Sequence, residues 1–179
     1  TTNNLLKIRN TANSDWITLR GLDGSLTSSA DASINSVAVG KGANSVAGNT
    51  VLGESALDAS VSGGNNTAIG KQALTALTSG ADNTAVGLEA MSATTTGIQN
   101  VAIGSFALDV NTEGDKNVAI GYAALDASTT ADNNTAVGHG TLSANTTASN
   151  NTAVGYLGLL VNTTGTQNVA VGGNALDAN

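Results

Sequence analysis

The sequence predicts an all-β protein: a parallel β-solenoid of about eight 17-residue coils, preceded by a small N-terminal β segment. A strict short period indicates a chain in which each unit stacks on the last, and 17 residues are too few for a helical repeat. One position before each period-marking glycine stands Leu, Ile or Val, as in a β-strand. The 179 residues include no proline, which would remove a donor from a backbone ladder that pairs above and below. The repeating glycines are Gly53, Gly70, Gly87, Gly104, Gly121, Gly138, Gly155 and Gly172.

Residues 1–34 lack this period and form the predicted N-terminal connector. Two strands, Leu5–Arg9 and Trp16–Leu19, are expected there, with a turn at Asp23-Gly24. The solenoid domain is expected to span residues 35–179. Its first unit is irregular, because Gly40 and Gly53 are only 13 residues apart. Since terminal repeats are usually atypical, we expect a shorter first coil here.

Each regular coil is predicted to contain two short strands and two corners. The first strand reads Thr/Val, Ala, Val/Ile, and the alternation is typical of a strand with two different faces. The glycine that follows permits a corner with positive φ. A second strand, with the pattern x-Ala-Leu-Asp-Ala, is expected next, and a Thr-Thr-Gly-x-Asn stretch returns the chain to the next coil.

Alanine recurs in two further columns of the repeat. One column directly precedes the Val/Ile column and should face away from it; the other lies beside the leucines. Because alanine buries little apolar area, the core of a single chain is expected to be thin. A solvent-facing surface has no reason to be alanine at every rung, whereas a surface closely approached by another chain does. We therefore predict a homotrimer with cyclic symmetry.

An unbroken column of asparagines lies four positions before the glycines. Stacked side-chain amides can donate to and accept from one another along the axis of a β-stack. We therefore predict a structural ladder of Asn49, Asn66, Asn83, Asn100, Asn117, Asn134, Asn151 and Asn168.

The position after each glycine follows no single chemistry, which predicts that it faces solvent. Both tyrosines and the only histidine of the chain occur there on three consecutive rungs, at Tyr122, His139 and Tyr156. Their flat faces and polar tips would suit stacking on sugar rings, and Phe106 would flank them. The alternative is a shape-filling ladder, or packing against a neighbouring subunit.

Other chemistry is scarce, so we expect no enzyme, no cofactor and no metal site. With one histidine and no cysteine, a single chain cannot form a histidine cluster or a thiolate site. Asp109 and Asp126 stand on adjacent rungs like a glycosidase pair, but serine replaces aspartate at the same position of other coils. The formal net charge of −7 disfavours nucleic-acid binding, and no run is long enough for membrane insertion. The sequence does not start with methionine, so we expect a fragment or a processed product.

Three segments resemble known families. Residues 35–43, Asn-Ser-Val-Ala-Val-Gly-Lys-Gly-Ala, look like the head repeats of trimeric autotransporter adhesins, which form a left-handed parallel β-roll in a homotrimer. Residues 150–156, Asn-Asn-Thr-Ala-Val-Gly-Tyr, resemble repeat arrays in bacteriophage tail fibres. Residues 5–19 are similar to a segment that often precedes such arrays in phage fibres. The 17-residue period is longer than the usual adhesin head repeat.

The resemblance implies a structural and receptor-binding segment of a phage tail fibre, located in the virion. Its partners would be two further copies of the chain, other tail-fibre or baseplate proteins, and a host cell-surface glycan. Two alternatives stay open: the head of a bacterial surface adhesin, and a passive spacer within a fibre.

Overall fold

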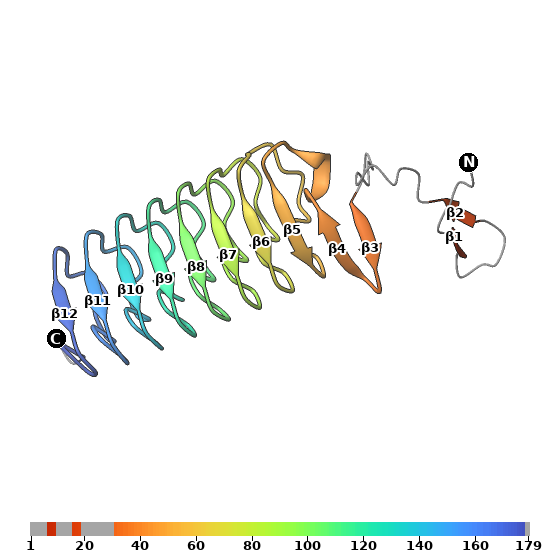
Figure 1. The fold of residues 1–179 in the computed structure, drawn as a ribbon. Helices are drawn as coiled ribbons and strands as arrows, with labels where there is room; N and C mark the ends of the chain where they lie inside the picture. The colour runs from red at the N-terminus through yellow and green to blue at the C-terminus, as the bar shows by residue number, and fades with distance from the viewer. Residues whose placement is uncertain (1–6, 10–15, 19–30, 178–179) are drawn as a thin grey trace.

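A computed structural model describes residues 7–9, 16–18 and 31–177 of the chain. Its main feature is a β-solenoid of about seven turns with 17 residues per coil (Figure 1). Ten strands form one sheet in the order β12-β11-β10-β9-β8-β7-β6-β5-β4-β3, and β1 pairs with β2 in a separate two-stranded sheet. The strands are β1 (Lys7–Arg9), β2 (Trp16–Thr18), β3 (Ala32–Ile34), β4 (Val37–Gly40), β5 (Thr50–Gly53), β6 (Thr67–Ile69), β7 (Thr84–Val86), β8 (Val101–Ile103), β9 (Val118–Ile120), β10 (Thr135–Val137), β11 (Thr152–Val154) and β12 (Val169–Val171).

Strands β5 to β12 are parallel, and each residue pairs with the residue 17 positions later, as Ala85 does with Ala102. The sequence period is therefore the sheet register. Eight parallel strands are joined by about seven turns, which is slightly fewer than the predicted eight coils. The antiparallel pair β1–β2 lies where two N-terminal strands were predicted, and the expected turn at Asp23-Gly24 lies outside the described residues.

The irregular first unit is not a shorter coil, contrary to the prediction. Strand β4 runs antiparallel to both β3 and β5, and a single 3-10 turn, η1 (Ala43–Ser45), follows it. The 13-residue spacing of Gly40 and Gly53 is too short to circle a 17-residue coil and return in the same direction, so the chain reverses. The predicted boundary between residues 34 and 35 falls in the β3–β4 turn, inside the ten-stranded sheet.

The strand alanines face the interior of their own chain, which corrects the prediction that they meet a partner. In each strand from β6 to β12 the central alanine is buried and its two neighbours are partly or fully exposed. The Val/Ile column therefore lies outside, with Ile103 40% exposed. Successive side chains of a strand point to opposite faces. The core next to each strand has room only for a methyl group, because the buried leucines fill the rest of the interior. The buried strand alanines are Ala68, Ala85, Ala102, Ala119, Ala136, Ala153 and Ala170.

The predicted second strand is a series of turns. The leucine column, including Met91, has φ between 49° and 54°, which is the left-handed region rather than the extended one. A left-handed backbone costs a residue such as Leu125 roughly 1–2 kcal/mol. Complete burial of a leucine side chain contributes about 1.5–3 kcal/mol and offsets that cost. Backbone bonds still link the rungs here, as between the Leu108 N–H and the Ala124 carbonyl at 2.9 Å.

The glycine column is required by the corner that it forms. Gly121 has a φ of 134°, and a Cβ added there would lie 2.4 Å from the Gly138 carbonyl oxygen of the next coil. The predicted positive-φ corner is thus present, and consecutive coils are too close for any side chain at this position.

Candidate functional site

The column that follows the glycines faces solvent, as predicted, and neighbouring side chains contact each other in two parts of it. Near the start of the solenoid, Lys71 Nζ lies 3.4 Å from Glu54 Oε2, and both side chains are about half exposed. Further along, the column becomes aromatic. This position therefore projects side chains outward at the spacing of the sheet, where neighbours on adjacent coils meet.

Tyr122, His139 and Tyr156 form one continuous stack. The ring centroids of Tyr122 and His139 are 5.1 Å apart with an interplanar angle of 19°, and those of His139 and Tyr156 are 5.4 Å apart at 32°. Phe106 meets Tyr122 edge-on, at 5.8 Å and 80°. Tyr122 and Tyr156 are 52% and 57% exposed. The structure thus brings together all four residues predicted as a binding stripe, and it leaves much of both tyrosine rings open to solvent.

The backbone under this aromatic stack is held on both sides. The Gly121 N–H donates to the Ile103 carbonyl at 2.8 Å, and the Tyr122 carbonyl accepts from the Gly140 N–H at 2.9 Å. The rings therefore project from a backbone that pairs with the coils before and after it. Such a scaffold presents them with little conformational freedom to lose on binding a ligand.

A groove adjoins the rings of Phe106 and Tyr122. It has a volume of about 420 Å³, and the sequence alone did not predict it. The available signal was that Asp109 and Asp126 lie a few residues after Phe106 and Tyr122 on the same two coils. The lining residues are Phe106, Asp109, Val110, Tyr122, Ala123, Asp126 and Ala127.

The two carboxylates of the groove differ in their surroundings. Asp109 Oδ1 accepts a hydrogen bond from the Ser92 hydroxyl of the preceding coil. Asp126 Oδ1 is buried and has no hydrogen-bond partner among the described residues. Burial raises the pKa of Asp126 above its ordinary value of 3.8, and the charge of Asp109 raises it further, against the lowering effect of the Asp126 and Ala127 backbone N–H groups. Asp126 thus lines the groove as a carboxyl group with one oxygen that neither solvent nor a donor among the described residues reaches.

The asparagine column lies inside the solenoid and bonds along its whole length. From Asn66 to Asn168, each asparagine backbone N–H donates to the side-chain Oδ1 of the asparagine one coil earlier, at 2.8–3.0 Å. The side-chain amide of Asn117 also donates to the Ala131 carbonyl at 2.7 Å, and equivalent bonds recur from Asn49 to Asn151. Most of these side chains are fully buried. The column can therefore hold the coils together but cannot contact a ligand.

A second buried polar column was not recognised in the sequence. Asn111, Asn145 and Asn162 close the return turn, where the Asn111 amide donates to the Gly114 carbonyl at 3.0 Å. Thr94 and Ser128 occupy the same column, and their hydroxyls have no partner among the described residues. The column is hard to recognise in the sequence because asparagine alternates there with threonine and serine instead of recurring in every coil.

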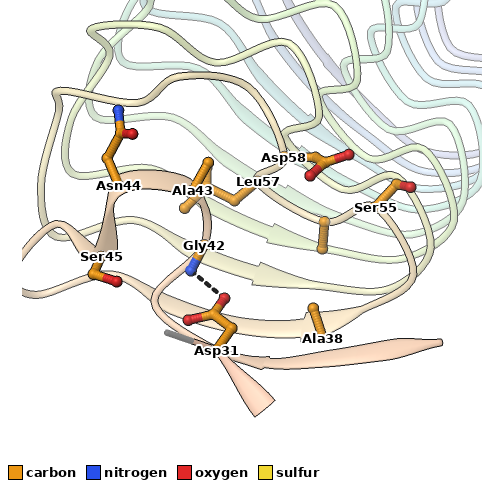
Figure 2. Close-up of a pocket in the computed structure, with 10 residues that line it drawn as sticks. Asp31, Ala38, Gly42, Ala43, Asn44, Ser45, Ser55, Leu57 and Asp58 are labelled. Carbon is orange, nitrogen blue, oxygen red and sulfur yellow. Dashed lines mark hydrogen bonds between the residues drawn. The ribbon is translucent and has the colours of Figure 1, made fainter. Parts of the chain in front are cut away.

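A larger cavity of about 630 Å³ lies where the antiparallel strands meet the first coil (Figure 2). The Asp31 carboxylate there accepts hydrogen bonds from the backbone N–H groups of Lys41 and Gly42, both at 2.6 Å. Its oxygens thus tie down the chain reversal after β4. Leu57 closes the solenoid core beneath, and this cavity is the end of the core.

The part of the chain that the structure describes lacks two features, a metal-binding cluster and a membrane-spanning helix. In residues 7–9, 16–18 and 31–177, no three His, Cys, Asp or Glu side chains are grouped closely enough to hold a metal ion. Within the same ranges, no helix has the length and apolar character needed to cross a membrane.

No family model, curated protein or solved structure matches this chain.

Proposed function

We propose that the chain is a rigid fibre segment of a phage tail fibre that attaches to a bacterial surface glycan through the Tyr122–His139–Tyr156 stack. The observation that carries the proposal is a row of three exposed rings at 5.1 and 5.4 Å on a backbone bonded from coil to coil. Aromatic faces with polar tips suit sugars, which present apolar C–H faces and hydroxyl edges. The resemblance of the repeats and of residues 5–19 to phage fibres supports a place in the virion.

Homotrimeric assembly is part of this proposal, but the proposed interface differs from the alanine surface that the sequence predicted. The alanines cannot supply the interface because they line the core of their own chain. The outer face of the sheet can supply the interface instead. It carries Val/Ile and Thr/Val columns at every rung, and its exposed residues include Leu52, Ile103, Val154 and Val171. Another copy has the same rung spacing and would match this face rung by rung. Threefold symmetry and left-handed winding follow from the family resemblance.

The proposed role is tested by removing the rings. The variant Tyr122→Ala with Tyr156→Ala, labelled with a fluorophore, is applied beside the parent protein to an array of bacterial surface polysaccharides. If each ring contributes about 1 kcal/mol, binding to the recognised glycan should weaken roughly 30-fold. The matched control is Glu54→Ala with Lys71→Ala, which removes an exposed pair from the same column without changing net charge.

Equal binding by the parent and the tyrosine variant would refute the role of the stack. A parent protein that binds no glycan on the array would favour a passive spacer, the function to which the regular coils and the asparagine ladder are also suited. The same stack could serve the head of a bacterial adhesin, in which case the proposed location would be the bacterial surface rather than the virion.

A further inference from the structure

The residues that line the groove beside the stack favour one class of sugar. Its walls are the rings of Phe106 and Tyr122, set at 80° to each other, so that one presents a face where the other presents an edge. The other apolar residues that line the groove are Val110, Ala123 and Ala127. The volume of about 420 Å³ falls within the range of about 300–1,000 Å³ that is usual for small-molecule sites.

The polar part of the groove is entirely acidic. Asp109 and Asp126 are its only ionisable side chains besides the Tyr122 phenol, and neither carboxylate has an ion-pair partner within residues 31–177. Asp126 Oδ1 is closed to solvent, so a ligand meets the charge of the groove through the other oxygens of the two carboxylates. A ligand that covers this groove must supply donors, because closing a carboxylate off from water without a partner is costly.

An ammonium group meets these demands better than a hydroxyl group. A hydroxyl donates one hydrogen bond and leaves both negative charges in place, whereas an ammonium donates three and also neutralises charge. The adjacent ring faces attract a cation further. A phosphate or carboxylate on the ligand would be repelled by the same two aspartates.

We propose that the groove binds a sugar with a free, protonated amine, a hexosamine unit, and thereby selects amino-bearing glycans over neutral or anionic ones. This inference rests on the proposed function, since it names the sugar class taken by the surface that includes Tyr122. Asp126 and Asp109 bind the ammonium, and the Tyr122 ring lies against the sugar face.

The test compares two probes in a mildly acidic buffer, with binding to the intact chain measured by calorimetry and saturation-transfer NMR. One probe is a glucosamine trisaccharide with free amines, and the other is the same trisaccharide fully N-acetylated. The amino form is expected to bind at least tenfold more tightly. Asp126→Asn and Asp109→Asn should each lower the affinity of the amino form roughly tenfold and leave that of the N-acetylated form unchanged. At position 109, asparagine keeps a side-chain oxygen that can accept from the Ser92 hydroxyl.

Asp58→Asn is the matched control, because Asp58 is exposed, holds the same place in its coil and lies outside the groove. If it weakens binding as much as Asp126→Asn does, the attraction is that of a polycation for an acidic chain, and the inference is overturned. Equal affinity for the two probes, or no binding of either, overturns it as well. If the amino and N-acetylated probes bind equally, and Tyr122→Ala abolishes that binding while Asp126→Asn changes neither affinity, the proposed function stands and this inference fails.

Discussion

The asparagine ladder leads to a prediction about stability that can be worked out bond by bond. Asn117 is fully buried in the middle of the column. Its Oδ1 accepts from the Asn134 backbone N–H at 3.0 Å, and its amide donates to the Ala131 carbonyl at 2.7 Å and to Asn100 Oδ1 at 3.2 Å. The substitution Asn117→Ala removes all three bonds.

The expected cost follows from the groups left behind. Asn100 Oδ1 keeps the Asn117 backbone N–H at 2.9 Å, so it stays paired. The Asn134 N–H and the Ala131 carbonyl have no other partner among the described residues. Each buried backbone group without a partner costs about 1–3 kcal/mol. We therefore expect Asn117→Ala to lower the free energy of unfolding by about 2–6 kcal/mol per chain.

Guanidinium denaturation followed by circular dichroism measures this change. The control is Asn133→Gly, because Asn133 is exposed on the same coil and has a φ of 57° that glycine adopts readily. That variant should differ from the parent by less than about 1 kcal/mol. If Asn117→Ala costs no more than Asn133→Gly, the ladder contributes nothing to stability and the bond-by-bond reasoning is refuted.

Two further predictions concern the charge of Asp126 and the outer face of the sheet. Because burial raises the folded-state pKa of Asp126, its protonated form stabilises the fold at pH below the unfolded pKa, and this contribution is lost as pH rises through the folded pKa. Asp126→Asn should therefore melt at a higher temperature than the parent at neutral pH and show a flatter pH profile; parallel profiles would contradict this. Sedimentation of the parent should give three times the 17.4 kDa chain mass, and Ile103→Lys with Ile120→Lys should reduce it to one. A folded parent monomer would refute the trimer.

Much of the fold was predictable because the period of the sequence repeat equals the offset between paired residues on neighbouring strands. The 17-residue spacing of Gly121 and Gly138 is the strand register itself, since each residue pairs with its counterpart one coil later. Which side of each strand faces inward was not predictable from pattern alone. Alternation shows that Ala119 and Ile120 face opposite ways, but it does not say which is inside. The core is so narrow that the smaller residue lies inside, against the usual expectation.

The aromatic stack was predictable from one column, whereas the groove beside it was not. Tyr122, His139 and Tyr156 occupy equivalent positions, so their contact follows from the register alone. The groove joins Asp126 to Phe106 across two coils and two columns, and their meeting depends on how the turn after Tyr122 folds. That turn was expected to be a strand.

The sequence by itself determined the period, the parallel stacking and the alignment of like residues in columns, because a strict repeat in a stacked chain places identical positions above one another. Only the tertiary structure decided what each column faces. Leucines such as Leu125 adopt a left-handed backbone that their own preference disfavours, because their complete burial offsets the cost. That conformation turns the chain where a strand was expected. The narrow core places alanine inside and the Val/Ile column outside, and the acidic groove lies beside Tyr122.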